Sequence, residues 1–192
     1  MIKYALQTVL LIALTITSTT TIEAQNLSLT GTSNSVVVSG TSSLHDWEMI
    51  LSGFKASTVI NKQDDGSVVL DNAVFTADAN NLSSDNSLMD KKAHEALNAK
   101  KAPEISFRQS DAVTIPAGGA KSFNMKGDIK IAGQTKSVSI PVSVKSQNNG
   151  TLQVKGTLPI TMSDYQMEPP TAMFGTVKTG DEVKVNFNLS LK

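Results

Sequence analysis

The chain has 192 residues, 40% of them hydrophobic and 18% charged, and its 17 basic and 17 acidic residues leave no net charge. This composition indicates one globular domain and excludes a disordered chain. The balanced charge gives no reason to expect nucleic acid as a partner. Because the chain has no cysteine, it has no disulfide, thiol nucleophile, thiolate metal site or lipid-modified N-terminal cysteine.

The first residues are typical of an export signal. Lys3 gives a positive start, residues 6–16 form an apolar stretch, and residues 22–24 suit a cleavage site. The stretch is short for a transmembrane helix. We therefore predict a signal peptide at residues 1–24 and a single mature domain at residues 25–192, periplasmic or secreted and without an integral membrane span. An uncleaved anchor is the alternative.

The C-terminal half alternates apolar and polar residues over long runs. In residues 183–191 every second residue is apolar, and residues 123–131, 138–144 and 152–162 follow the same pattern. Successive side chains of a strand point to opposite faces, so each run has one apolar and one wet face. These runs predict antiparallel strands that curl around an interior.

The N-terminal half has shorter strand-like runs. They lie at residues 34–40, 47–51, 57–60 and 67–78, and the inward face of the last run is ambiguous because Val68–Leu70 are all apolar. Eight or nine strands joined mostly by short turns favour a closed barrel or a sandwich. Side chains fill the interior of an eight-stranded barrel, or it holds one small ligand.

One segment, Ser87–Lys100, has a helical pattern. Ser87 and Asp90 have the spacing of a capping box, and Pro103 ends the helix. One face is apolar, and its residues are Met89, Ala93, Ala96 and Leu97. We expect this helix to cover the barrel, either as a stabilising plug or as a gate for a ligand.

Five segments occur in a characteristic order. They are Gly40–Trp47, Met89–Phe107, Gly127–Val138, Met162–Tyr165 and Gly180–Val183. Their order and spacing resemble the YceI-like family of exported bacterial proteins over essentially the whole mature chain. The most specific pieces are the Gly-x-Thr-Lys-x-Val hairpin and the Leu-x5-Pro-x-Ile-x-Phe passage. The chain differs from the commoner family pattern in having no Arg-Asp before the helix and in a longer segment at 168–175.

The resemblance implies an all-β fold, a lipocalin-like eight-stranded antiparallel barrel with one α-helix in a crossover connection. It also implies that an apolar tunnel holds a long polyisoprenoid chain, such as a quinone tail or a prenyl lipid. It implies no catalytic activity.

Polar residues that could carry chemistry are few. His45 and Asp46 are adjacent, with Ser42–Ser43 nearby, but neighbouring strand residues point to opposite faces, and a triad also needs an oxyanion hole. His94 follows Asp90 by one helical turn, a spacing that more often makes a surface contact than a metal site. We predict no enzyme, no catalytic residue and no metal site.

The inward apolar rows remain as the candidate site. Periodicity alone favours a packed core, but the sparse aromatic residues, the methionines and the inward Gly127 and Gly156 fit an apolar tunnel equally well. The resemblance favours the tunnel, and we predict as its ligand a long-chain isoprenoid, a quinone-type lipid or another amphiphile, with no other cofactor. The predicted ligand-binding residues are Trp47, Phe107, Phe123, Met125, Ile129, Val138, Ile140, Val142, Leu158, Ile160, Met162, Met173, Phe174, Val185, Phe187 and Leu189.

The predicted function is thus that of an exported, non-catalytic carrier or store that encloses a long apolar chain. One alternative is a filled-core barrel that binds another protein through residues 163–180 or its outer face. A second, an outer-membrane barrel, requires aromatic girdles, and aromatic residues make up only 5% of the chain. We expect Met167, Met173 and Phe174 of the irregular 163–180 connection to fold over one barrel end or to meet a partner.

Overall fold

The computed structural model describes residues 24–31, 34–117, 120–147 and 149–192, and residues 1–23 of the expected signal peptide lie outside this part. The strands are β1 (Ala24–Ser28), β2 (Ser35–Ser42), β3 (Trp47–Leu51), β4 (Lys55–Lys62), β5 (Val68–Asp78), β6 (Leu82–Ser83), β7 (Glu104–Gln109), β8 (Val113–Ile115), β9 (Ala120–Ile131), β10 (Gln134–Ser146), β11 (Leu152–Thr161), β12 (Thr171–Ala172) and β13 (Val177–Leu191). The helices are α1 (Ser87–Ala96) and the short 3-10 helices η1 (Ala79–Asn81), η2 (Met162–Tyr165) and η3 (Met173–Gly175). No helix in the described ranges has the length and apolar character needed to cross a bilayer.

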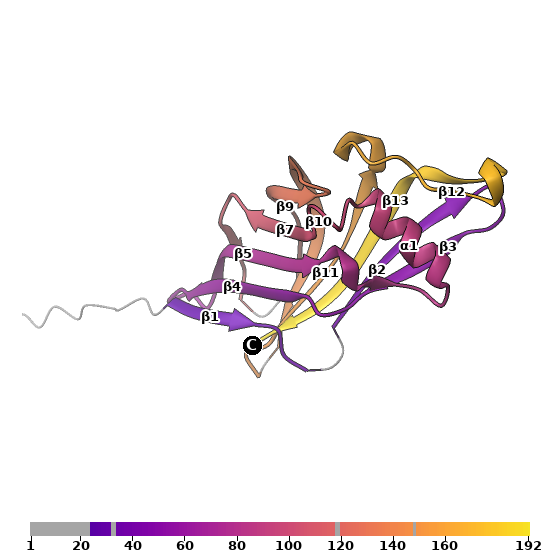
Figure 1. Ribbon diagram of the computed structural model, residues 1–192. Coiled ribbons are helices and arrows are strands. Elements are labelled where there is room, and N and C mark those ends of the chain that lie inside the picture. The colour runs from indigo at the N-terminus through magenta and orange to yellow at the C-terminus, as the bar shows by residue number, and fades with distance from the viewer. Residues whose placement is uncertain (1–23, 32–33, 118–119, 148) are drawn as a thin grey trace, which may run out of the picture.

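The strands form one curled antiparallel sheet in the order β1-β4-β5-β7-β9-β10-β11-β13-β2-β3-β6 (Figure 1). The end of β1 also pairs with the end of β13. Ser28 and Lys192 exchange backbone hydrogen bonds of 3.1 and 2.8 Å, and the N–H of Thr30 donates to Ser190 O at 2.9 Å. Eight strands, from β1 round to β13, therefore form a ring that closes at this end. The expected all-β antiparallel class is confirmed, with more strands than the eight expected.

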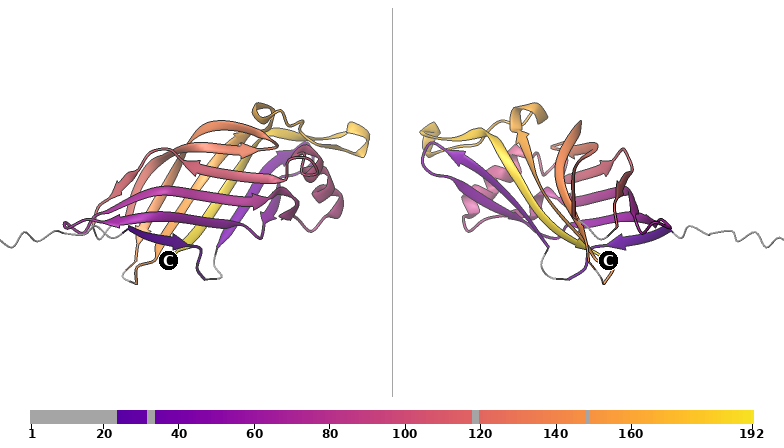
Figure 2. Two further views of the ribbon diagram at one scale, coloured as in Figure 1. Left: turned by 60° about the vertical axis from the view of Figure 1, so that its left-hand side comes forward. Right: turned by 180° about the vertical axis from the view of Figure 1, so that it is seen from behind.

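The sheet continues past the ring on the other side of the molecule. β2, β3 and β6 follow β13 in the strand order, and α1 packs against β6. Figure 2 shows these strands running away from the closed end towards α1 and the β12–β13 turn. The ring is thus closed by backbone hydrogen bonds at one end and covered by a helix at the other.

The ambiguous face of β5 has a structural cause. Asn72 adopts a left-handed φ of 53°, and the register between β4 and β5 shifts between Ser57 and Val59. Before this bulge Leu70 is buried, and after it Ala73 and Phe75 pack on the core. The inward set therefore changes from even to odd residues, because a bulge inserts one extra residue into the ladder. Asparagine is among the residues that tolerate this conformation best.

Two buried polar side chains satisfy the backbone at the bulge. Thr58 Oγ1 donates to Asp71 O at 2.9 Å. Gln109 Oε1 accepts the N–H of Ala73 at 2.9 Å, and its Nε2 donates to Asp111 O at 2.6 Å. Both residues are buried, and both replace hydrogen bonds that the interrupted ladder does not make.

Aromatic rings cover three glycines of the strands. A Cβ atom added to Gly156 would lie 2.5 Å from Phe187 Cζ and 2.8 Å from Pro141 O, and Phe187 is its direct cross-strand partner. The other pairs are Gly127 with Phe107 and Gly40 with Trp47. Gly127 and Gly156, whose inward positions fitted an apolar tunnel, therefore leave no open space themselves, because the rings of neighbouring strands occupy it.

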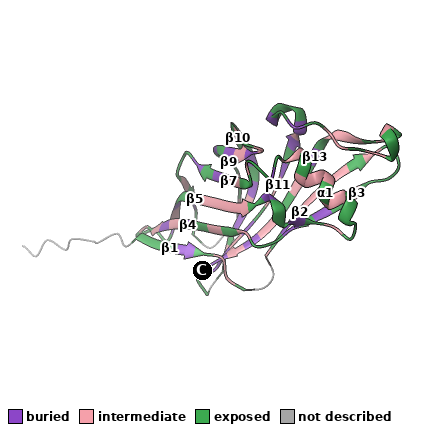
Figure 3. Ribbon diagram, viewed as in Figure 1, coloured by how far each residue is buried: buried purple, intermediate pink, exposed green. Residues whose placement is uncertain are grey.

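The closed end of the ring is filled by side chains. Leu27, Ile60, Ile115, Val144 and Leu152 are all buried there. Helix α1 at the other end has no buried residue between Ser87 and Ala96, and Figure 3 shows it in the colours of half-buried and exposed residues. The barrel therefore has one packed end and one end that is only partly covered.

The ring of Trp47 gives a direct test of the aromatic–glycine pairs. Every atom within 3.0 Å of a Cβ placed on Gly40 belongs to this ring. We expect Gly40→Ala to lower the free energy of unfolding by about 1–3 kcal/mol, the usual cost of overpacking. In a Trp47→Leu background the same change should cost much less, which a double-mutant cycle by urea unfolding measures. Equal costs in the two backgrounds would contradict the steric explanation.

Candidate functional site

An apolar cavity of about 270 Å³ lies inside the ring beneath α1. Side chains from β2–β7, β9–β11, β13 and α1 line it, and all are apolar or aromatic except Thr58, Lys92 and Thr179. The Thr58 hydroxyl already donates to Asp71 O. The interior therefore offers a ligand almost no hydrogen bond and selects for apolar groups.

The polar groups lie where the wall reaches solvent. The side chain of Lys92 is 42% exposed, and its Nζ lies 3.8 Å from Glu95 Oε2. Its methylene stem can line the cavity while its ammonium group stays in water. Trp47 also lines this region, and its Nε1–H donates to Thr41 O at 3.0 Å. The cavity thus has an apolar interior and a polar rim beside α1.

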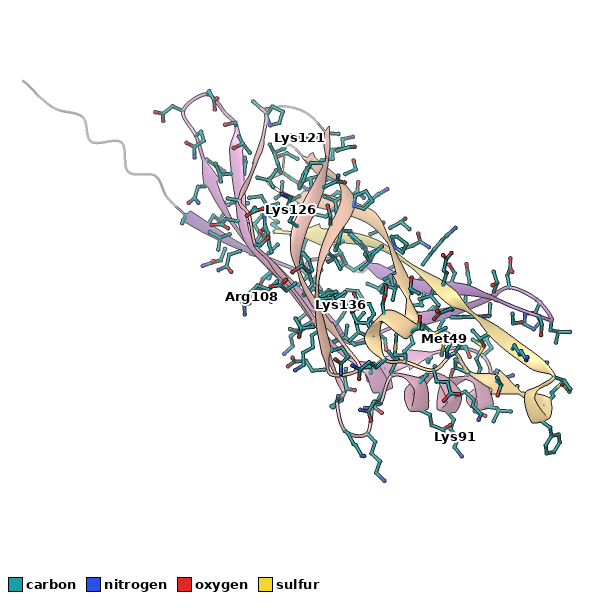
Figure 4. The ribbon with its side chains drawn as sticks, turned by 90° about the horizontal axis from the view of Figure 1, so that it is seen from above. Met49, Lys91, Arg108, Lys121, Lys126 and Lys136 are labelled. Atoms are coloured by element: carbon teal, nitrogen blue, oxygen red, sulfur yellow. The ribbon has the colours of Figure 1, made fainter. Side chains whose placement is uncertain are left out.

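Helix α1 covers the cavity with the face that its sequence predicts. Met89, Ala93, Ala96 and Leu97 all line the cavity. Lys91 points away from the sheet in Figure 4, on the opposite face. The 3.6-residue period therefore identified the covering surface correctly.

The caps of α1 differ from those expected. Asn86, not Ser87, is the N-cap, and its Oδ1 accepts the N–H groups of Leu88 and Met89 at 3.0 and 3.2 Å. Asp90 reaches back to Ser84, whose N–H and hydroxyl both donate to Asp90 Oδ1 at 2.7 Å. An asparagine side chain in this position competes well with serine for the first free N–H groups.

The helix ends four residues before the expected Lys100. It ends at Ala96 because Asn98 turns to a left-handed φ of 52°, and the N–H of Ala99 then donates to His94 O at 2.9 Å. His94 Nε2 donates to Leu82 O at 2.7 Å. This side chain ties the helix to β6 and makes no contact of a metal-ligand kind.

Comparison with known proteins assigns the chain to a family. A family model described as the YceI-like domain matches residues 62–191. The chain belongs to the YceI-like family. No curated protein matches its sequence.

Several solved structures share the YceI-like fold at low sequence identity. Burkholderia cenocepacia BcnA is 24% identical, with a TM-score of 0.61 over 82% of this chain and 95% of that one. A polyisoprenoid-binding domain from Saccharophagus degradans is 13% identical, with a TM-score of 0.64 over 86% and 97%. The Campylobacter jejuni YceI protein is 16% identical, with a TM-score of 0.56 over 99% and 97%. At these identities the likeness concerns the fold.

Most of the predicted ligand-binding residues line the cavity, although their role in binding stays a prediction. Phe123 and Val138 do not line it and pack, partly buried, against the surrounding core. Met173 and Phe174 do not line it either and are exposed to solvent. The residues that do line it are Trp47, Phe107, Met125, Ile129, Ile140, Val142, Leu158, Ile160, Met162, Val185, Phe187 and Leu189.

Sequence reasoning missed most of the contribution of the N-terminal strands, of which it named only Trp47 in β3. Leu70, Ala73 and Phe75 of β5 line the cavity on both sides of the bulge at Asn72. Their alternation changes phase within one strand, so no single period identifies them. The other lining residues of this half include Val36, Val38, Met49, Leu51, Ala56 and Leu82, and the short alternating runs of β2 and β3 were the available signal.

The serine, histidine and aspartate near residue 45 form a structural turn. Ser42 Oγ donates to His45 O at 2.7 Å and accepts the N–H groups of Leu44 and His45. His45 Nδ1 lies 2.6 Å from Asp46 O, a backbone atom. Ser43 Oγ accepts the N–H of Lys178 at 3.0 Å. The side chains thus bind backbone groups of the turn and of β13. Within the described residues no group of three or more metal-ligating side chains occurs.

The 163–180 connection is more regular than expected, and its apolar residues divide into two groups. η2, β12, η3 and the start of β13 lie within it. Tyr165 and Met167 are buried, and Met167 lines the cavity as a residue folded over the barrel end. The N–H and hydroxyl of Ser163 both donate to Asp181, and these bonds hold the pKa of that carboxyl below its usual range. Met173 and Phe174 are exposed and do not fold back over the barrel end, so for these two residues only the second expected alternative, contact with a partner, stays a prediction.

The N-cap of α1 gives a test of what holds the helix over the cavity. Asn86→Ala removes the acceptor for two helical N–H groups and should lower the free energy of unfolding by about 1 kcal/mol. We expect the amides of α1 to exchange hydrogen faster while those of β9–β11 keep their relative protection. Asn124→Ala, on the exposed face of β9, is the matched control and should leave α1 unchanged. Unaltered α1 exchange in Asn86→Ala would show that packing alone holds the helix.

Proposed function

We propose that this protein is an exported, non-catalytic lipid-binding protein that encloses an isoprenoid or similar long apolar chain. The observation that carries the proposal is the cavity of about 270 Å³ with its apolar wall. A filled-core interaction module has no use for such a space, so the cavity favours a carrier or store over that alternative. The polyisoprenoid-binding domain of Saccharophagus degradans, which has the same fold, supports the choice of ligand class.

The size of the cavity fits a long chain. An engineered apolar cavity of about 150 Å³ holds benzene, so on this scale a cavity of about 270 Å³ accepts about eleven carbon groups of a longer chain. Enclosing about eleven carbon groups at ~0.8 kcal/mol each contributes about 9 kcal/mol. Association costs of at least about 4 kcal/mol leave at most about 5 kcal/mol, so the enclosed carbons alone give an affinity no tighter than roughly 0.1–1 mM, and contacts outside the cavity must supply any tighter binding.

The distribution of polar groups gives the bound chain an orientation. An apolar tail fits the interior, where Thr58 is already hydrogen-bonded. A polar head would lie at the rim, near the Lys92 ammonium group and Thr179. No step of bond making or breaking is required, because the function consists of enclosure and release.

Filling the cavity from α1 separates binding from folding. Ala93 lines the cavity, and we expect Ala93→Phe to reduce uptake of a fluorescent isoprenoid at least about tenfold. The added ring fills apolar space, so the free energy of unfolding should stay the same or rise by about 0.5–2 kcal/mol. Lys91→Phe places the same ring on the outward face and should bind like the parent. Uptake at the parental level by a folded Ala93→Phe variant would place the ligand elsewhere.

Export is the second part of the proposal, and it concerns the residues before β1. Ala24 and Gln25 are both exposed at the start of β1, so a substitution at either leaves the core intact. We expect cleavage after Ala24, blocked by Ala24→Leu and permitted by Gln25→Leu, because the processing site requires a small residue at its end. N-terminal sequencing of the protein from cell fractions measures this. A parent chain that retains Met1 and stays with the membranes would contradict export by cleavage.

A further inference from the structure

The end of the molecule beside α1 carries large apolar side chains that nothing covers. Leu44, in the β2–β3 turn, is 68% exposed, while Met173 and Phe174, in η3, are 70% and 110% exposed. The two turns are joined, because the N–H of Ser43 donates to Lys178 O at 2.9 Å and the N–H of Lys178 donates to Ser43 Oγ at 3.0 Å. We call residues 41–46 and 171–179 together the apolar tip. Figure 1 shows both turns at the far end from the β4–β5 turn.

The backbone of the tip is strained in a way that keeps these side chains in water. Met173, Phe174 and Gly175 have consecutive left-handed φ angles of 49°, 55° and 85°. Non-glycine residues rarely adopt this conformation, and strain of this kind occurs preferentially at sites of function. The turn is secured by Thr176, whose N–H and hydroxyl donate to Met173 O at 3.2 and 2.7 Å. The most apolar residues of the turn are thus held outward.

The apolar tip continues directly from the rim of the cavity. Pro170 and Thr179 both line the cavity, and the N–H of Thr179 donates to Pro170 O at 3.1 Å. β12 and η3 follow Pro170 immediately. On the other turn, Trp47 lines the cavity three residues after Leu44. A surface that touches the tip therefore lies next to the open side of the cavity.

The tip has no net charge that would select an ionic partner. Its formal charges are those of Asp46 and Lys178, which cancel, with His45 neutral at pH 7. Three exposed side chains are also far fewer than the 20–30 residues that each partner of a stable protein interface contributes. A neutral apolar surface of this size fits the interfacial layer of a lipid bilayer, where aromatic and aliphatic side chains leave water without needing a shaped partner.

We propose that the apolar tip inserts reversibly into the interfacial layer of a lipid bilayer and so brings the rim of the cavity to the membrane. The purpose of this contact rests on the proposed function, since an isoprenoid resides in membranes and must leave or enter one. Insertion itself does not depend on a ligand, since Leu44, Met173 and Phe174 drive it. It is hydrophobic, so it takes place on zwitterionic lipid and does not weaken with salt.

A single label at the tip tests insertion. The chain has no cysteine, so Phe174→Cys gives a unique site for a polarity-sensitive fluorophore. Asp64→Cys, in the exposed β4–β5 turn at the opposite end, is the matched control. With phosphatidylcholine vesicles that contain no isoprenoid, we expect a blue shift and quenching by lipid-borne spin labels at position 174 and neither at position 64. The fluorophore reports only the polarity around position 174. If the protein attached to vesicles through another segment, the emission of this label would not change.

A second variant tests which side chains drive insertion. Met173→Asn with Phe174→Asn keeps residues that tolerate a left-handed backbone but removes both apolar groups. In a chain labelled at Leu44→Cys, this double change should weaken partition of the tip into vesicles at least about tenfold, since each large apolar side chain contributes about that factor. Thermal stability should not change, because both side chains are exposed.

Three results would overturn the proposal. The first is a label at position 174 that stays in water with every vesicle. The second is insertion that requires anionic lipid and disappears in high salt. The third is a fluorescence shift that depends on protein concentration without vesicles, which would assign the tip to a protein partner. Failure of the proposed function is distinguishable. If the tip inserts but the protein takes up no isoprenoid, the membrane contact stands and the carrier function fails. If the protein takes up isoprenoid but the tip does not insert, the carrier function stands and the membrane contact fails.

Discussion

Closure of the backbone ladder at one end only is the constraint on which this structure depends. Residues 28–30 pair with the last residues of β13, and this completes the hydrogen bonding of a sheet edge that would otherwise face water. At the same end, Leu27, Val144 and Leu152 fill the ring. Further along, β13 pairs with β2 instead, and the sheet widens towards β3 and β6. The space this leaves is too wide for side chains to fill, and α1 covers it.

The sequence predicted the strands of the C-terminal half well because each of them faces the core on one side throughout. β9, β10, β11 and residues 183–191 of β13 keep the alternation, and most of the expected lining residues come from them. β5 could not be read in the same way, since the left-handed Asn72 changes which residues face inward. The packing role of Gly127 and Gly156 was not visible in the sequence either. The aromatic rings that cover these glycines come from other strands, and only the strand register brings ring and glycine together.

Loop residues were predicted least well, and the reason is physical. Met167, Met173 and Phe174 have similar side chains, yet the first is buried and the other two are exposed. The difference arises from the backbone, since η2 is tied to Asp181 through Ser163 while η3 turns left-handed. Neither event has a periodic signal in the sequence. The conformation of the turn therefore decides whether an apolar loop residue packs on the protein or stays exposed for contact with another surface.

The apolar cavity also has an energetic consequence. At about 24 cal/mol per Å³, a cavity of 270 Å³ costs roughly 6 kcal/mol relative to a packed interior. That is comparable to the whole stability of an ordinary domain, about 5–15 kcal/mol. A ligand that fills the space recovers contacts that the surrounding side chains lack, and by linkage it stabilises the fold as it binds. On the proposed function, the free energy that the unfilled cavity costs is the free energy that would retain a ligand, and release would become favourable where another apolar medium, such as a bilayer, offers the chain equivalent contacts.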